Sequence, residues 1–415
     1  MFDNVLHQSA SDLLAEDIQK DRLPGSILFS GPSASGKLTC ALELSRVLSC
    51  VGQPRGRWDC NCSSCVKHRA MVSQNLLIAG PGNRTLEIAA AKTTLLSQNA
   101  KNTSHLEAAR YLYLRAVRKL TARFSSILWK DDDKLSKFAP ILLGIDENLE
   151  LLTPGRTIPD GDELSKILDD IEKLATKLEA SFLYDSLPVL QIRNFSEWAH
   201  LSTETGKKVL IIENADCMAD SARNALLKIL EEPPENTVFI LTTSRRSSML
   251  ATILSRVRTY TFFERSVEQQ REVINRVFHY DPVVGGGPVP DSINGFLQTY
   301  FPVKPDTVKY NAELFFRTIA EGHVPNIPSI VSVCGGFEPR QLFRIFMESI
   351  VNFQKPMLNS ASGCEASAKV VEAVGRTVNN VGIYNQNPAA GLEELVRTLM
   401  QINRTYGGVF SEVLS

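Results

Sequence analysis

Residues 25–50 read GSILFSGPSASGKLTCALELSRVLSC and decide the fold class of the N-terminal part of the chain. The apolar run ILF predicts a short strand, and the apolar residues after the loop recur at the i, i+3, i+4 spacing of a helix. Between them, Gly31 to Lys37 has the GxxxxGK spacing of a phosphate-binding loop. Gly31 and Gly36 let backbone amides face phosphate oxygens, and Lys37 can reach the terminal phosphates. We therefore predict a P-loop between a strand and a helix.

Two later segments extend this pattern into a sheet. Residues 207–214 (KKVLIIEN) form an unbroken apolar run that suits a central parallel strand buried on both faces. Residues 238–243 (VFILTT) form another, after a helix rich in Ala and Leu that ends at Pro233. Strands that alternate with helices predict an α/β fold with a doubly wound parallel sheet.

The phosphate loop departs from its pattern at the next residue. Position 38 normally carries Ser or Thr, whose hydroxyl ligates the magnesium ion that bridges the phosphates. Leu38 stands there, and Thr39 comes one residue too late, which on a helix is a rotation of about 100°. We expect the loop to accept phosphate and to be poorly built for magnesium-dependent hydrolysis.

A second departure follows the run 207–214. A P-loop ATPase of the AAA+ class ends this strand in Asp-Glu, where the Asp orients magnesium and the Glu polarises water. Glu213 and Asn214 stand there instead. Asn cannot act as a general base, and Glu213 is one methylene too long to replace the Asp cleanly. The alternative, that Glu213 binds metal well enough for slow turnover, stays open.

Four of the eight cysteines crowd into one short stretch. Cys50 is followed by Cys60, Cys62 and Cys65, so that one turn-rich loop can bring four thiols together. Four thiolates favour tetrahedral zinc in a closed structural site. The alternatives are His68 in place of one cysteine, or reduced cysteines without a metal.

The rest of the chain is mainly helical in pattern. Residues of about 90–185 show helical periodicity without strands and predict a helical insertion. Its first helix is basic, which favours a solvated face over a nucleic-acid contact; its cations are Arg110, Arg115, Arg118, Lys119 and Arg123. The Gly/Pro-rich stretch 281–290 predicts a loop near a domain boundary. From about residue 323, amphipathic segments predict an all-helical module.

Composition narrows the class of protein. The 415 residues suggest roughly two to four domains. The 45 Lys and Arg residues nearly balance 46 Asp and Glu residues, so the chain as a whole does not strongly attract phosphate backbones. We find no leader pattern and no apolar run of the ~20 residues that a membrane span needs. We expect a cytoplasmic protein that does not bind a membrane.

Several strings resemble the bacterial clamp-loader subunits of DNA polymerase III, gamma/tau and delta-prime. They are FDNVLHQ (2–8), the phosphate loop, SARNALLKILEEPPENTVFILTTS (221–244) and LATILSRVRTYTF (250–262), and YNQNPAAGLEELVRTL (384–399) is weakly similar. The resemblance covers most of residues 1–265. It implies an AAA+ domain at 1–265 with a zinc module at 50–65, a helical lid at 266–322 and a helical collar at 323–415.

The resemblance also implies roles for single residues. Ser255 and Arg256 match the Ser-Arg-Cys motif, whose arginine enters a neighbouring subunit's ATP site and stabilises charge on the transferred phosphoryl group. Thr243 matches the residue that senses the gamma-phosphate. The family carries a four-cysteine zinc module after the P-loop helix, usually spaced CxxCxxC rather than the CxCxxC of Cys60 to Cys65.

An intact arginine finger beside a damaged ATP site implies a delta-prime-like subunit without efficient ATPase activity of its own. It would act within the DNA polymerase III holoenzyme, load the sliding clamp onto primer-template DNA, and have the gamma/tau and delta subunits as partners. ATP or ADP binding would be degenerate. One alternative is an ATP-hydrolysing gamma/tau-like subunit. Another is an unrelated P-loop kinase, against which the string NALLKILEEPP argues.

Overall fold

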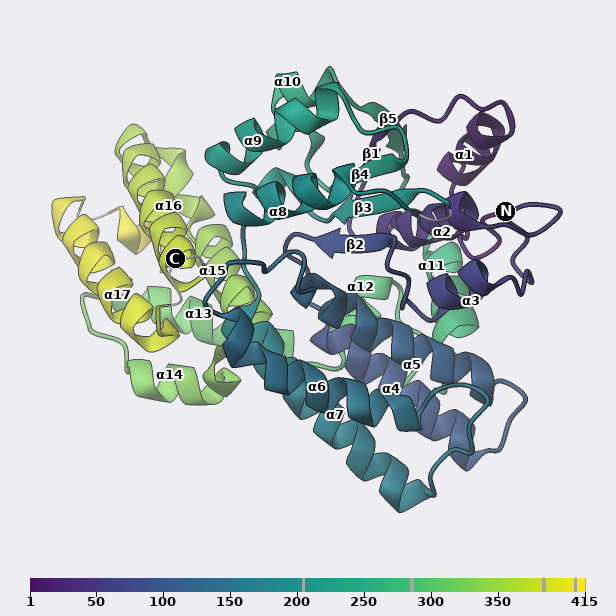
Figure 1. The fold of residues 1–415 in the computed structure, drawn as a ribbon. Helices are drawn as coiled ribbons and strands as arrows, with labels where there is room; N and C mark the ends of the chain where they lie inside the picture. The colour runs from purple at the N-terminus through teal and green to yellow at the C-terminus, as the bar shows by residue number, and fades with distance from the viewer. Residues whose placement is uncertain (204–205, 284–286, 383–385, 407–408, 415) are drawn as a thin grey trace. The chain divides into compact units, whose positions relative to one another are not determined.

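The computed structural model of the chain describes residues 1–203, 206–283, 287–382, 386–406 and 409–414 (Figure 1). The chain divides into two compact units, Met1–Leu297 and Gln298–Ser415, which are described separately. Among the described residues, no helix is both long enough and apolar enough to span a membrane.

A five-stranded, wholly parallel sheet forms the centre of the first unit. Its spatial order is β2-β3-β4-β1-β5. The strands are β1 (Ser26–Ser30), β2 (Leu76–Ala79), β3 (Lys208–Ile212), β4 (Thr237–Thr243) and β5 (Arg258–Thr261). The predicted α/β class with a parallel sheet is confirmed. The three strands expected from their apolar runs are β1, β3 and β4, which lie together in the middle.

The central strands are buried on both faces, as their unbroken apolar runs require. Successive side chains point to opposite faces, so the same strand contributes to two cores. Leu28 and Leu210 pack into the core on one face, whereas Ile27 and Ile211 pack into the other.

Helices surround this sheet in the first unit. They are α1 (Ala10–Gln19), α2 (Lys37–Ser49), α3 (Ser63–Arg69), α4 (Thr85–Ala100), α5 (Leu106–Thr121), α6 (Leu135–Leu151), α7 (Gly161–Phe182), α8 (Val189–His200), α9 (Asp220–Glu231), α10 (Ala251–Leu254), α11 (Val267–Phe278) and α12 (Ile293–Gln298). Helices α4 to α7 pack against one another and form the helical insertion predicted between β2 and β3 (Figure 1).

The basic helix of the insertion is α5, and the prediction that its cations are solvated is wrong. The side chains of Arg110 and Arg123 are almost fully buried. Arg115 donates to the carbonyl of Arg69, and Arg118 donates to that of Ala70. These cations hold neighbouring backbone in place, because a buried guanidinium must find acceptors for its N–H groups.

The second unit is all-helical. It contains α13 (Pro305–Ala320), α14 (Ile327–Val333), α15 (Gln341–Phe353), α16 (Ala361–Gly382) and α17 (Pro388–Thr405) around one apolar core. Helix α13 packs against α15. The amphipathic segments expected after residue 323 lie in α15 and α17, which confirms that this part is helical. The boundaries of the lid and the collar stay predictions, and residues 284–286 and 384–385 of the strings quoted above lie outside the described residues.

Candidate functional site

The phosphate loop connects β1 to α2 at the carboxyl edge of the sheet. Gly36 is the N-cap of α2 and has a φ of 95°, which a residue with a side chain rarely adopts. At Gly31 a Cβ atom would lie 2.2 Å from the carbonyl oxygen of Phe262, so no side chain fits there. The predicted glycines are therefore required by the backbone path of the loop itself.

Lys37 is folded back onto its own loop. Its Nζ atom donates to the carbonyl oxygens of Gly31, at 2.7 Å, and Pro32, at 2.5 Å. Burial lowers the pKa of Lys37 to about 8, although Glu213 and Asp216 favour the charged form. The backbone of the loop thus supplies the acceptors for the ammonium group.

Arg265, which the sequence analysis did not single out, covers the start of α2. Its Nη1 atom donates to the carbonyl of Ala34 at 2.8 Å, and its Nε and Nη2 atoms donate to the carbonyl of Leu6. The residue is only 8% exposed, and its Nη2 atom would lie 2.9 Å from a Cβ at Gly36. A second cation therefore stands directly against the glycine that begins the helix.

Leu38 and Thr39 lie in the first turn of α2, at the position where a magnesium-binding hydroxyl is expected. Leu38 is partly buried and packs against the core formed by α1, α2 and one face of the sheet. Thr39 follows it on α2 and is also partly buried. The expected direction of the Thr39 side chain, away from a metal, stays a prediction.

Glu213, directly after β3, forms ion pairs with two arginines. Its carboxylate accepts hydrogen bonds from Nη2 of Arg84 on both oxygens, and from Nη2 of Arg123. The side chains of Glu213, Arg84 and Arg123 are 14%, 15% and 2% exposed. Burial alone would raise the pKa of Glu213, but the two guanidinium groups outweigh burial and hold that pKa below its usual value. The carboxylate is therefore ionised and already neutralised by protein cations.

Two further residues extend this group of three into what we call the buried ion cluster: Arg84, Glu87, Lys119, Arg123 and Glu213. Glu87 accepts from Lys119 and, at 3.4 Å, from Arg84. The members come from the start of α4, the end of α5, the turn after α5 and the end of β3. The cluster therefore fastens the helical insertion to the strand end where an AAA+ ATPase would bind magnesium.

Glu179 of α7 reinforces the same junction from a third helix. Its carboxylate accepts from the backbone N–H groups of Arg84, at 2.6 Å, and Thr85, at 3.2 Å, and from the Thr85 hydroxyl. A carboxylate at a helix N-terminus satisfies donors that have no partner within the helix. Glu179 thus caps α4.

Asn214 and Thr243 also have protein partners. Asn214 adopts a left-handed conformation with a φ of 50°, and its Nδ2 atom donates to the carbonyl of Pro81 at 2.8 Å. The Thr243 hydroxyl, fully buried, donates to Asp216 at 2.8 Å, and Arg245 donates to the same carboxylate at 3.0 Å. Asp216 and Arg245 were not expected from the sequence, because neither belongs to the strand-terminal pair on which the prediction depended.

The four predicted cysteines are brought together. The sulfur atoms of Cys50, Cys60, Cys62 and Cys65 all lie within 4.8 Å of one another. Zinc–sulfur bonds of about 2.3 Å in a tetrahedron place sulfurs about 3.8 Å apart, and Cys50 and Cys60 are separated by 3.7 Å. The cluster is compatible with structural zinc, and the shorter CxCxxC spacing does not prevent the approach of any of the four sulfurs.

Despite burial, hydrogen bonds to sulfur lower the pKa of Cys50 and Cys62 in this cluster, whereas the pKa of Cys65 is raised. Burial opposes ionisation of Cys62, but the backbone N–H groups of Cys65 and Val51 lower its pKa to about 6. The backbone N–H of Gly56 donates to Cys50 at 3.2 Å. Burial and the neighbouring thiols raise the pKa of Cys65, and Arg46, which donates to that sulfur at 3.0 Å, opposes the rise. A zinc ion binds cysteine as the thiolate, and the donors at Cys50 and Cys62 favour that form.

Arg46 organises the loop that carries the cysteines. Its side chain is 2% exposed and pairs with the equally buried Glu43, at 2.6 Å, one turn earlier on α2. It also donates to the carbonyls of Gly56 and Arg57. The sequence feature that could have indicated this role is the i, i+3 spacing of Glu43 and Arg46. The structure adds that α2, which carries both, is buried on nearly all sides. His68 lies outside the four-ligand group and contacts Ser45 instead, at 3.4 Å.

Arg256 lies at the surface, just after α10. Its Nε and Nη2 atoms donate to Oε1 of Glu231, the last residue of α9, and its Nη1 atom donates to the carbonyl of Thr252 at 2.7 Å. Its side chain is 29% exposed. The guanidinium is thus accessible from outside the chain and held by contacts within it.

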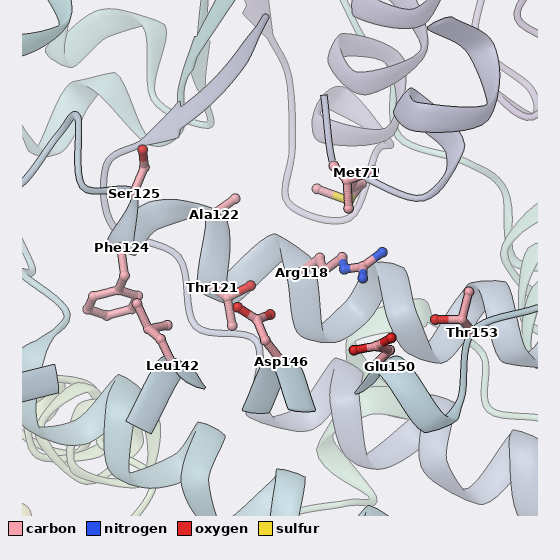
Figure 2. Close-up of a pocket in the computed structure, with 11 residues that line it drawn as sticks. Met71, Arg118, Thr121, Ala122, Phe124, Ser125, Leu142, Asp146, Glu150 and Thr153 are labelled. Carbon is pink, nitrogen blue, oxygen red and sulfur yellow. The ribbon is translucent and has the colours of Figure 1, made fainter. Parts of the chain in front are cut away.

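A pocket of about 520 Å³ lies between α5, α6 and the segment at Met71 (Figure 2). No residue of the phosphate loop lines it. Its lining mixes apolar groups such as Phe124 and Leu142 with Arg118, Asp146 and Glu150. Arg118 already donates to a backbone carbonyl, and Glu150 accepts from Arg156 at 2.6 Å. We therefore place the candidate chemistry at the carboxyl edge of the sheet, not in this pocket.

Comparison with protein families gives one match that covers more than half of the chain. Residues 6–130 and 163–266 match the model of a family described as "DNA polymerase III, delta subunit". The segment between these two matches includes all of α6.

Individual relatives match over shorter stretches. The chain is similar to the DNA polymerase III subunit delta' of Haemophilus influenzae, with 41% identity over 71 residues, which are 17% of this chain and 22% of that protein. It is 42% identical over 66 residues to the subunit delta' of Bacillus subtilis, covering 16% and 20% of the two chains. It is also 36% identical over 77 residues to the subunit gamma/tau of Mycobacterium bovis, covering 19% and 13%. The chain thus spans about a fifth of the length of the delta' relatives that it matches.

A search of solved structures finds a gamma subunit-related protein of a DNA polymerase III from Thermotoga maritima. It has 17% identity and a TM-score of 0.26, over 53% of this chain and 81% of that chain.

Proposed function

Because the chain belongs to the DNA polymerase III delta subunit family, we propose that it is a delta-prime-like subunit of the clamp loader. In this role it assembles with sister ATPase subunits and does not hydrolyse ATP efficiently itself. It completes a neighbour's ATP site instead.

The proposal rests mainly on the hydrogen bonds between the Glu213 carboxylate and two arginines, Arg84 and Arg123. A magnesium-binding carboxylate must direct its oxygens at the ion, whereas both oxygens of Glu213 accept from arginines. Leu38 removes the hydroxyl ligand, and Asn214 removes the group that would polarise water. Three separate features of one site therefore argue against efficient hydrolysis by this chain.

Arg256 has the properties that a trans-acting arginine needs. It is partly exposed, fixed at its base, and carries a planar fork of donors that suits phosphate oxygens. An arginine placed against a transferred phosphoryl group accelerates its transfer by about 10³ to 10⁵. We propose that the ATP site it enters belongs to a gamma/tau-type subunit.

In this role the chain would bind zinc and a nucleotide and would work with several partners. Structural zinc would be bound by Cys50, Cys60, Cys62 and Cys65, where it would fix the loop after α2. Nucleotide would be held weakly, by Gly31, Gly36 and Lys37, without a competent magnesium site. The partners are the gamma/tau and delta subunits, the sliding clamp, and primer-template DNA reached through the complex.

The test measures ATP hydrolysis by the purified chain alone, and then by a gamma/tau-type partner mixed with the chain. We expect no turnover by the chain alone and a partner rate that falls by orders of magnitude with Arg256→Ala. Arg22→Ala, another exposed arginine paired with carboxylates, is the matched control and leaves the partner rate unchanged. An equal partner rate with Arg256→Ala and wild type would refute the trans-acting role.

The similarity to gamma/tau subunits supports a second candidate, an ATP-hydrolysing subunit of the same complex. Robust turnover by the isolated chain, lost in the variant Lys37→Ala, would favour it over the first.

A further inference from the structure

The contacts of Arg256 within its own chain divide its donors into two sets. A guanidinium has five N–H groups in a fixed fork. Glu231 accepts on the Nε–Nη2 edge, with Nε at 2.9 Å, and the Thr252 carbonyl and Ser255 hydroxyl accept from Nη1, at 2.7 and 3.3 Å. These contacts use up to four of the five N–H groups, and the longest of them is the 3.3 Å contact to the Ser255 hydroxyl, whose release leaves the pair of N–H groups at the end of the fork for another acceptor. This is the pair that grips a phosphate or carboxylate with two parallel hydrogen bonds.

Buried neighbours anchor the segment that carries Arg256. Ile253 and Val257, which flank Arg256 by three residues and one, are buried at 0% and 9% exposure. Helix α10 packs against α9, whose last residue is Glu231. Glu231 ends α9 and Arg256 lies in the turn directly after α10, so the packing of these two helices brings the carboxylate and the guanidinium together.

We propose that Glu231 is the positioning residue of Arg256: it holds the guanidinium edge-on, so that the end of the fork points outward toward a phosphate of a neighbouring subunit. This inference rests on the proposed function, since it concerns the orientation of a group that acts in trans. Glu231 does not touch the phosphate itself. Its effect is to remove rotamer freedom that a long side chain would otherwise lose when the neighbour's site closes.

The charge and the exposure of Glu231 decide whether it positions Arg256 or competes with a phosphate for the guanidinium. Glu231 is 49% exposed at its side chain, so water screens its attraction for the guanidinium. The carboxylate is thus strong enough to bias the rotamer and too weak to retain the arginine against a phosphate. Because it takes one edge only, Arg256 can bind phosphate without leaving Glu231.

The experiment uses the variant Glu231→Gln in the complete chain, mixed with a gamma/tau-type partner. Gln keeps the shape and one acceptor oxygen but removes the charge. We expect the partner's kcat for ATP to fall about three- to tenfold, because only one of the two holding contacts is weakened, while its KM for ATP stays within about twofold. The matched control is Glu232→Gln, which neutralises the adjacent exposed carboxylate and leaves kcat unchanged.

The variant Glu231→Gln combined with Arg256→Ala separates this inference from the proposed function. If Glu231 acts through Arg256, the double variant is as slow as Arg256→Ala alone. If Arg256→Ala has no effect, the proposed function fails. If Arg256→Ala abolishes stimulation but Glu231→Gln matches wild type or exceeds it, the proposed function stands and Glu231 is not a positioning residue. A thermal unfolding midpoint equal to wild type shows that Glu231→Gln folds.

Discussion

Replacing Glu213 by Gln tests whether this carboxylate is a structural group or a vestigial magnesium ligand. Gln has nearly the same shape, so the change removes charge without opening a cavity. It leaves Arg84 and Arg123 buried and without the anion that both now contact. If Glu213 served a metal instead, its removal would leave folding stability unchanged or improve it.

The expected loss of folding stability depends on how deeply the ion pairs are buried and on which contacts the two arginines keep. Removal of one partner from a buried ion pair costs about 3 to 5 kcal/mol. Arg84 keeps its contact with Glu87, and Arg123 keeps an acceptor in the carbonyl of Gly80 at 3.3 Å. We therefore expect about 3 to 4 kcal/mol. For a unit of the size of Met1–Leu297, that is a fall in the unfolding midpoint of about 5 to 6 °C.

The assay is thermal unfolding followed by circular dichroism, with the midpoint compared between variant and wild type. Glu197→Gln is the control, because its ion pair with Lys130 is 66% and 58% exposed and its loss should change stability by less than about 0.5 kcal/mol. The double variant Glu213→Gln, Arg84→Met should cost less than the sum of the single changes. An unchanged or raised midpoint for Glu213→Gln would refute the structural role of the buried ion cluster.

Three further outcomes are expected. Cys60→Ser lowers bound zinc, measured by mass spectrometry of the metal, from about one ion per chain, and a chelator lowers the unfolding midpoint of wild type; equal zinc in both proteins would contradict the assignment. Gly52→Ala also weakens zinc binding, since its Cβ would lie 2.4 Å from the Cys60 sulfur, whereas Gly161→Ala, whose Cβ meets nothing, does not. Burial, together with the charges of Arg46 and Arg115, lowers the pKa of His68 to about 4. Between about pH 6.5 and 4 the imidazole is therefore protonated in the unfolded chain and neutral in the folded chain. Stability is then lost as the pH falls from about 6.5 to 4, by up to about 3 kcal/mol, and a pH titration of denaturant midpoints should be flatter in His68→Gln.

The strands that the sequence predicts and those that it misses differ in a physical way. β1, β3 and β4 are central and buried on both faces, so their sequences are unbroken apolar runs. β2 and β5 are the edge strands, each four residues long, and β5 has one buried residue among polar ones. The polar β5 therefore leaves little apolar pattern in its sequence, whereas β2 is apolar and mostly buried but is too short for its pattern to distinguish a strand from a helix segment.

The features of the candidate site also fall into those that the sequence predicts and those that it misses. The strand–loop–helix arrangement around Gly31 to Lys37 and the grouping of the four cysteines were predictable because the residues lie close in sequence or follow a fixed spacing. The partners of Glu213 were not, because Arg84 and Arg123 lie 129 and 90 residues away from it. Nothing in a basic α5 distinguishes a solvated arginine from one buried against a distant carboxylate, since only the packing of the insertion onto β3 decides between the two.

If the chain does not hydrolyse ATP, as we propose, the buried ion cluster also limits how a competent magnesium site could be built in it. Restoring a hydroxyl at position 38 and Asp-Glu at positions 213 and 214 would repair the sequence motifs. A shorter carboxylate at 213, turned toward magnesium, would however abandon Arg84 and Arg123 inside the protein. A magnesium-binding carboxylate at position 213 would therefore also require changes at Arg84, before α4, and at Arg123, in the turn after α5. Under the proposed function, the buried ion cluster would therefore oppose the gain of ATP hydrolysis through single substitutions.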